Sequence, residues 1–460
     1  MATQVAVASL QDSLRGKVIE PRDEAYESAR RVHNAMIDRR PRLIAQCVDA
    51  ADVMAAIRFG RESDLRVAVR GGGHSPAGFA VCDDGLVIDL SRMRGVRVDP
   101  GAGTVRVAGG ALWGDVDHAG HPFGLAVPAG IISTTGVGGL TLGGGHGYLT
   151  RKYGLTIDNL LEADLVLADG RQVTASAEQH PDLFWAIRGG GGNFGIVTSF
   201  LFRAQPVGVV PMGITAWGLD QATEVLQWYR EFIPAAPDDV YGWIGFATVP
   251  PAPAFPVEAH GRKVCVAVWC YLGKPEKAER ALAPALSIGP PLLSALQRVP
   301  FPKVQSQFDA LAPAGLQGYW RGQFLTDLPD EAIAVHLEFA AELPTPLTLA
   351  HLYPVDGAAG RVAPDATPFS FREAKWSMVI AGLDPDPANA ERITSWTKSY
   401  WEALRPYSAS AAYVNFMMDE GADRVKATYR GNYARLAAVK AEYDPDNTFR
   451  VNQNIPPKAP

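Results

Sequence analysis

The chain has 460 residues, of which 47% are hydrophobic and 20% are charged, and its formal net charge is −6 at pH 7. This length favours two or three domains of a globular protein. The acidic balance argues against a protein that coats nucleic acid, and no run of about 18 apolar residues predicts a membrane span. The N-terminal stretch lacks a basic segment followed by an apolar run, so we expect no signal peptide and a cytoplasmic protein.

The first 200 residues combine short apolar runs with many glycines. The runs predict strands separated by glycine turns, at residues 65–70, 85–90, 104–109, 161–170 and 194–202. Apolar residues recur at helical spacing over 52–63 and again, more briefly, over 181–188, which predicts two helices.

The character of the sequence changes at about Pro206, after which prolines cluster between longer elements. Residues 221–233 have the pattern of an amphipathic helix, and residues 264–272 alternate like a strand. A further helix is expected over 432–445, near the C-terminus. We therefore predict three segments, with limits at 1–205, 206–405 and 406–460.

The four cysteines are scattered and form no CxxC pair. Cys265 and Cys270 lie in one predicted strand, and their odd spacing places them on opposite faces. Buried reduced thiols fit this pattern and a cytoplasmic location. Two histidines, His118 and His121, are three residues apart but have no evident third ligand, so no metal site is expected.

Three glycine clusters stand out, at residues 71–74, 136–148 and 188–195. Glycine permits positive φ and close backbone approach, and successive main-chain amides form anion-binding concavities. The clusters therefore predict a nucleotide-type cofactor. Within the third cluster GxGxxG occurs, but a predicted helix precedes it and a predicted strand follows it. This order is the reverse of the Rossmann unit, and the P-loop sequence is also absent.

His74 ends the first cluster, four residues after Arg70. Alone, it is either a structural residue beside a phosphate-binding turn or a nucleophile delivered to a ligand. His146, in the second cluster, has the same ambiguity. Ser75 has no nearby acid–base partner that would make it a nucleophile.

Six motifs occur in a characteristic order: VRGGGHSPAG (69–78), GLVIDLSRM (85–93), GGALWGDVD (109–117), residues 124–160, DLFWAIRGGGGNFGIVTSF (182–200) and YDPDNTFRVNQNIPP (443–457). Together they resemble the berberine-bridge-enzyme-like flavoprotein oxidases of the vanillyl-alcohol-oxidase, or PCMH-type FAD-binding, superfamily. The resemblance extends from about Val18 to Pro457. AQCVDAADV (45–53) is similar to the bacterial subgroup of 6-hydroxynicotine oxidase and antibiotic-pathway flavoenzymes.

The resemblance implies an α+β fold. A two-subdomain PCMH-type FAD-binding domain would begin the chain at 1–205, and a substrate domain with an antiparallel sheet covered by helices would follow at 206–405. Residues 406–460 would return to the FAD-binding domain.

The resemblance also implies that His74 forms an 8α-histidyl bond to FAD. Arg70 and the amides of the following turn would hold the pyrophosphate; the turn residues are Gly71, Gly72, Gly73 and Ser75. Many relatives add a second bond from a cysteine at the position of Ile132, so a single covalent link is expected here.

Motif matching adds further expected cofactor contacts. In the second cluster and after it these are Ile132, Thr135, Gly138, Gly139, Gly143, Gly144, Gly145 and Asn159. Near the adenine half they are Asn193, Gly195 and Val197. A C-terminal strand would bring back Tyr413, Asn415, Asn452 and Gln453.

The catalytic base departs from the family pattern. Relatives that oxidise alcohols and sugars often have Y-x-N-Y, with the second tyrosine as base, but this chain has Phe416 there. The first tyrosine of the motif, Tyr413, is expected to be a catalytic residue as well as a cofactor contact. His351 and Tyr353 lie on one face of a predicted strand and are replacement candidates, although core or solvent positions remain open. Weaker candidates are Tyr319, Arg321 and Glu373.

Thr135 would lie beside the reactive face of the flavin, where it either controls oxygen access or only packs. The expected function is an FAD-dependent oxidase of an alcohol or amine in a small or secondary-metabolite substrate, with hydrogen peroxide as product. The alternatives are an oxygenase that uses a flavin–oxygen adduct and a noncatalytic flavin-binding protein. The expected partners are a small-molecule substrate and molecular oxygen, without nucleic acid or membrane, in a monomer or homodimer.

Overall fold

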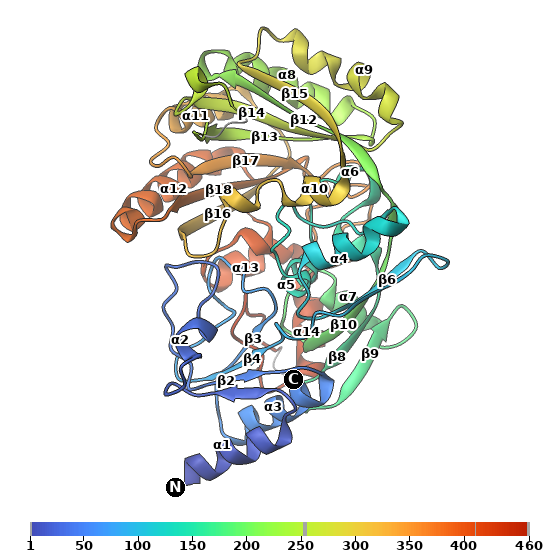
Figure 1. The fold of residues 1–460 in the computed structure, drawn as a ribbon, viewed down its shortest axis with the longest axis vertical. Coiled ribbons are helices and arrows are strands. Elements are labelled where there is room, and N and C mark those ends of the chain that lie inside the picture. The colour runs from blue at the N-terminus through green and yellow to red at the C-terminus, as the bar shows by residue number, and fades with distance from the viewer. Residues whose placement is uncertain (1, 252–254, 410, 458–460) are drawn as a thin grey trace.

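The computed structural model describes residues 2–251, 255–409 and 411–457. Figure 1 shows two regions, one above the other. The lower region contains the N-terminal strands and the C-terminal helices, and the upper region contains one large sheet with helices on its outer face. Within the described ranges, none of the helices has the length and apolarity that a membrane crossing needs.

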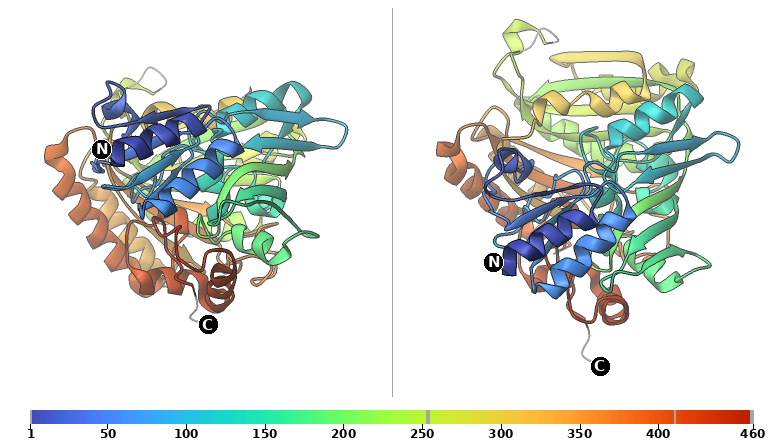
Figure 2. Two further views of the ribbon diagram at one scale, coloured as in Figure 1. Left: turned by 90° about the horizontal axis from the view of Figure 1, so that it is seen from below. Right: turned by 60° about the horizontal axis from the view of Figure 1, so that its bottom comes forward.

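A small four-stranded sheet begins the lower region, in the order β1-β2-β4-β3. Its strands are β1 (Lys17–Ile19), β2 (Leu43–Gln46), β3 (Val67–Arg70) and β4 (Leu86–Asp89). β4 is parallel to both β2 and β3, and the crossover from β2 to β3 is α3 (Ala50–Glu62), which confirms the predicted helix. Figure 2 shows α1 (Ala2–Ser13) lying beside α3. The GGGH turn directly follows the carboxyl end of β3, because this strand ends at Arg70.

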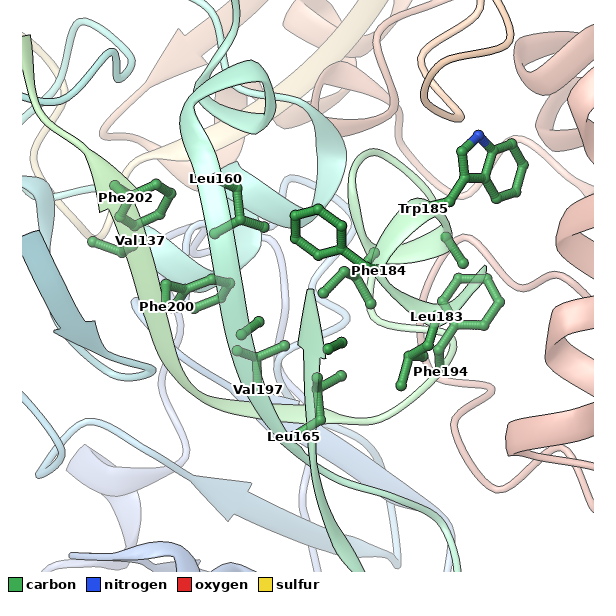
Figure 3. Close-up of a cluster of buried hydrophobic side chains, with 14 of the residues drawn as sticks. Val137, Leu160, Leu165, Leu183, Phe184, Trp185, Phe194, Val197, Phe200 and Phe202 are labelled. Atoms are coloured by element: carbon green, nitrogen blue, oxygen red, sulfur yellow. The ribbon is translucent and has the colours of Figure 1, made fainter. Parts of the chain in front are cut away.

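A five-stranded antiparallel sheet completes the lower region, in the order β5-β6-β10-β8-β9. Its strands are β5 (Val96–Asp99), β6 (Thr104–Ala108), β8 (Leu160–Val166), β9 (Gln172–Ser176) and β10 (Ile196–Arg203). Helix α7 (Pro181–Ile187) precedes the third glycine cluster and β10 follows it, so the predicted non-Rossmann order is confirmed. Figure 3 shows Phe184 of α7 gathered with Leu160 and Phe200 of this sheet in one apolar core.

The upper region is a seven-stranded antiparallel sheet in the order β15-β12-β14-β13-β17-β18-β16. Its strands are β12 (Val209–Gly218), β13 (Val240–Thr248), β14 (Lys263–Tyr271), β15 (Leu293–Pro300), β16 (Gln317–Leu325), β17 (Leu349–Pro354) and β18 (Trp376–Asp384). The outer face packs against α8 (Ala222–Ala235), α11 (Asp330–Ala341) and α12 (Ala390–Leu404).

The cysteines test the predicted faces of this sheet. Cys265 packs in the core beneath the helices, whereas Cys270 packs in the cluster on the opposite side, as the odd spacing predicts. All four cysteines are buried and unbridged.

Short elements connect these sheets. They are α2 (Tyr26–Ala29), α4 (Trp113–Gly120), β7 (Leu125–Ala126), α5 (Val137–Gly143), α6 (Thr150–Tyr153), β11 (Gln205–Pro206), α9 (Ala278–Leu282) and α10 (Phe301–Ser306). Buried Arg151 of α6 joins the two regions, because its guanidinium pairs with Asp356 at 2.7 Å and donates to main-chain carbonyls at the end of α8 and the start of β13.

The C-terminal segment returns to the lower region through α13 (Ala422–Tyr429) and α14 (Tyr433–Tyr443), and α14 confirms the predicted helix. The predicted C-terminal strand is wrong: residues 411–457 contain no strand, and Val414–Phe416 form a 3₁₀ turn. Side-chain hydrogen bonds replace a strand ladder here. Gln453 donates to the carbonyls of Met417 and Met418.

Candidate active site

A cavity of about 530 Å³ lies between the glycine clusters and the inner face of the seven-stranded sheet. Segments far apart in the chain meet around it, from the GGGH turn to the C-terminal segment. The predicted site residues that line it are Gly71, Gly72, Gly73, His74, Ser75, Ile132, Thr135, Gly138, Gly139, Gly195, Val197, His351, Tyr353, Tyr413, Asn415, Asn452 and Gln453. The fold therefore brings most of the predicted set to one cavity.

The GGGH turn packs directly on the second glycine cluster. A Cβ added at Gly72 would lie 2.5 Å from the amide nitrogen of Gly136, and one added at Gly136 would lie 2.4 Å from that of Gly72. Only glycine permits this approach. Within the described residues, the main-chain N–H groups of Gly72 to Ser75 donate no hydrogen bond, so they remain available to an anionic group.

His74 extends from this turn into a neutral environment. Its ring lies 4.0 Å from the ring of His33, its Nε2 lies 3.2 Å from Oγ1 of Thr134, and its Nδ1 lies 3.5 Å from Oγ1 of Thr135. Burial, followed by the nearby His33, lowers the pKa of His74 to about 3. The imidazole is therefore uncharged at neutral pH and keeps the lone pair that a nucleophile needs.

His33 is a site residue that sequence reasoning missed, because no motif surrounds it. Its Nε2 lies 3.0 Å from the carbonyl oxygen of Ala312, which only accepts, so Nε2 carries the proton. Burial lowers the pKa of His33. His33 therefore adds no positive charge beside His74.

His351 and Tyr353 lie on the same face of β17, as the alternation predicts, and both line the cavity. The Tyr353 hydroxyl is 3.0 Å from Nε2 of His351. Burial, and then His146, lower the pKa of His351 to about 3, and burial raises the pKa of Tyr353 well above its usual value. Both groups are neutral, and in the tautomer with the imidazole proton on Nδ1 the Tyr353 hydroxyl donates to Nε2 of His351.

His146 and Tyr413 complete the polar side of the cavity. The His146 ring lies 4.5 Å from that of Tyr413 and 4.9 Å from that of Tyr353. The Tyr413 hydroxyl oxygen accepts from the main-chain N–H of Gly145 at 2.8 Å and from the amide of Asn415 at 2.6 Å. Burial raises the pKa of Tyr413, so its own proton stays bound. Phe416 lines the same wall but has no group that accepts a proton.

The side chains of three predicted polar cofactor contacts have hydrogen-bond or ion-pair partners within the protein. Arg70 is buried and pairs with Asp89 at 3.0 Å. Asn159 donates to two main-chain carbonyls before β8 and accepts from Gln205. Asn193 bonds to main-chain atoms of the third glycine cluster and of the C-terminal segment. None of the three lines the cavity.

The glycines of the GGG run at 143–145 do not line the cavity either. Added Cβ atoms would meet the Asn415 amide at 2.2 Å from Gly143, Phe369 at 3.0 Å from Gly144, and Thr156 at 2.1 Å from Gly145. These glycines therefore permit close packing at these positions.

The weaker base candidates lie outside the cavity lining as well. Arg321 pairs with Glu420 and also donates to the Tyr319 hydroxyl at 3.2 Å. Glu373 pairs with Arg430. Each therefore has a structural partner instead of access to a substrate.

The residues present fit FAD. The GGGH turn offers main-chain donors for a pyrophosphate, His74 offers a neutral imidazole, and the remaining walls are mostly apolar, as a flat flavin ring requires. Among the described residues, no group of three or more His, Cys, Asp or Glu could hold a metal ion.

Known proteins are similar to this chain over nearly its whole length. Residues 41–176 match the family described as FAD binding domain, and residues 412–456 match the family described as berberine and berberine like. The FAD-linked oxidoreductase YgaK of Bacillus subtilis is 33% identical, over 96% of this chain and 97% of that protein. (R)-6-hydroxynicotine oxidase of Paenarthrobacter nicotinovorans is 30% identical, over 97% and 98%.

A solved structure gives the same result for the fold. The crystal structure of 6-hydroxy-D-nicotine oxidase from Arthrobacter nicotinovorans has a TM-score of 0.85 at 26% identity, covering 97% of this chain and 99% of that one. The expected α+β architecture, with a PCMH-type FAD-binding region and an antiparallel sheet, is confirmed. The chain belongs to the berberine-bridge-enzyme-like family of FAD-linked oxidoreductases.

Proposed function

We propose that the protein is an FAD-dependent oxidase of an alcohol or amine in a small or secondary-metabolite substrate, with molecular oxygen as the electron acceptor and hydrogen peroxide as product. One observation carries the proposal: the neutral His351–Tyr353 pair lines the same cavity as the GGGH turn and His74. We further propose a cytoplasmic monomer or homodimer, with domain limits at 1–205, 206–405 and 406–460.

Bound FAD would accept a hydride from the substrate carbon and transfer the electrons to oxygen. The protein's part is to orient the substrate and to take the proton from its hydroxyl or amine group. Tyr353 donates its own proton to Nε2 of His351, so its oxygen is free to accept one from the substrate. His351 can take the proton that Tyr353 passes on.

We propose His74 as the only covalent attachment to the cofactor. Ile132 lines the cavity at the position where relatives have the second attachment residue. None of the described lining residues is a cysteine, and Cys82 is buried with its Sγ 3.6 Å from the carbonyl oxygen of Arg66. The remaining proposed cofactor contacts are the other predicted contacts that line the cavity: Gly71, Gly72, Gly73, Ser75, Thr135, Gly138, Gly139, Gly195, Val197, Tyr413, Asn415, Asn452 and Gln453.

The oxidase proposal predicts anaerobic bleaching of the flavin by substrate, followed by hydrogen peroxide equal in amount to the product when air is admitted. A substrate screen read by flavin absorbance tests the first step, and a peroxidase-coupled assay tests the second. Oxygen-18 from labelled O₂ in the product would instead identify an oxygenase. A flavin that no substrate bleaches would identify a noncatalytic binding protein.

Replacing His74 with alanine should abolish covalent attachment while leaving the fold intact, because the imidazole supplies the bond and its contacts are limited to His33, Thr134 and Thr135 at the cavity wall. Mass spectrometry of tryptic peptides should find flavin on the His74 peptide of the wild type and on no peptide of His74→Ala. Cys82→Ser is the matched control and should keep full attachment. Noncovalent FAD in the wild type, or flavin on a second peptide, would contradict the single link.

Replacing Tyr353 with phenylalanine or His351 with alanine should slow anaerobic flavin reduction by about 10²–10⁴-fold, the usual value of a positioned proton acceptor. Because the pKa of His351 is lowered to about 3, the imidazole remains able to accept a proton, and the wild-type reduction rate should not fall from about pH 8 down to pH 5. A loss of rate centred near pH 6.5 would count against a buried neutral His351. Tyr319→Phe, outside the cavity, is the control.

Thr135 lines the cavity beside His74, and we propose that its modest bulk admits oxygen. Thr135→Leu should therefore slow reoxidation of the reduced enzyme by roughly tenfold, without an equal effect on reduction by substrate. Stopped-flow mixing with oxygenated buffer measures this rate. Thr134→Val is the control, because Thr134 also contacts His74 but does not line the cavity. Unchanged reoxidation in Thr135→Leu would mean that the residue only packs.

A further inference from the structure

One row of paired residues crosses the inner face of the seven-stranded sheet, with a polar residue, His351, at one end and apolar residues after it. In the register of the strands, His351 on β17 pairs with Gly245 on β13, Gly245 pairs with Val266 on β14, and Val266 pairs with Ala216 on β12. Directly paired residues point to the same face of a sheet, so the row crosses the strands in a line. Neighbouring strands lie about 4.8 Å apart, so the row is about 14 Å long.

The row has no side chain at Gly245, and further apolar residues border it on both sides. Gly245 has no side chain, and a Cβ there would meet the main chain of β17, which explains why glycine occupies this position. On one side of the row lie Trp243, Val268 and Ile214, and on the other lie Ala247 and Val264. All five line the cavity. The sheet therefore presents an apolar groove that starts at His351.

Among the described residues, the lining of the groove and of the rest of the cavity carries no fixed charge. None of the described residues that line the cavity is Asp, Glu, Lys or Arg. Its four histidines are His33, His74, His146 and His351, and burial lowers the pKa of each. A charged substrate would therefore lose its hydration without gaining an ionic partner, which is costly.

We infer that the substrate is an uncharged lipophilic molecule with one polar group, which binds with that group at His351 and Tyr353 and with its apolar part along the row toward Ala216. This inference rests on the proposed oxidase function and adds the substrate class. An apolar part as long as the row would be a medium-length alkyl chain or an extended fused-ring system. The oxidised carbon would be the one that bears the polar group.

Binding of straight-chain primary alcohols to the holoenzyme tests the inference without requiring turnover. Anaerobic titration, followed by calorimetry, should give a dissociation constant that falls about fourfold for each added methylene group. The gain should stop when the chain exceeds the row. Alcohols of equal length with a carboxylate or ammonium group at the far end should bind at least about 100-fold more weakly.

Substitutions on the row should change the length dependence. Ala216→Phe fills the far end, so the longest alcohols should bind roughly tenfold more weakly while short alcohols bind as before. Val266→Ala removes two methyl groups near the middle of the row and so cannot overpack it. The space that it opens should improve the affinity for alcohols with a branch near the middle of the chain. Ala295→Phe is the matched control, since Ala295 is exposed on β15 and does not line the cavity.

Two results would overturn the inference: affinity that does not depend on chain length, or charged chains that bind as tightly as neutral ones. Bleaching of the flavin in the same samples separates this inference from the proposed function. Length-dependent binding with no bleaching by any alcohol or amine would refute the oxidase and keep the lipophilic site. Bleaching by charged substrates alone would keep the oxidase and refute the substrate class.

Discussion

The contact between the main chains at Gly72 and Gly136 is the constraint on which the site depends. Each glycine occupies space that a Cβ on the other would need, so the first two glycine clusters can meet only as glycines. This contact fixes the turn that carries His74 against the segment that carries Ile132 and Thr135. The His74 imidazole and the Thr135 hydroxyl consequently lie within 3.5 Å of each other. A larger residue at either position would push the turn that carries His74 away from the segment that carries Ile132 and Thr135.

The opposite wall depends on a similar approach within the large sheet. Gly245 on β13 permits the close approach of β17, because a Cβ at this position would meet the β17 main chain. His351, which pairs with Gly245, therefore lies at one end of the apolar groove. Charged pairs hold the two walls together from outside the cavity: Arg151 with Asp356, and Arg372 with Asp158. The protein therefore uses ion pairs for assembly and leaves the reaction space between the walls uncharged.

Much of this arrangement follows from sequence, because strand alternation and glycine clusters are local signals. The shared face of His351 and Tyr353 could be predicted from period two alone. Arg70, Asn159 and Asn193 lie outside the cavity lining for a common reason: a motif identifies a polar residue but not its partner. Their partners, among them Asp89 and Gln205, are set by tertiary packing. His33 was missed for the same reason, since only the folded chain brings it to His74.

The absence of fixed charge among the described lining residues limits the chemistry of the cavity. Hydride loss alone would leave a positive charge on the substrate, and no lining carboxylate is present to stabilise it. Proton loss alone would leave an anion, and no lining lysine or arginine is present either. When the hydride and the proton leave a neutral substrate together, the substrate carries no charge at any stage. An uncharged cavity is therefore consistent with the proposed function, in which the His351–Tyr353 pair would take the proton as the hydride leaves and no charged residue would be needed.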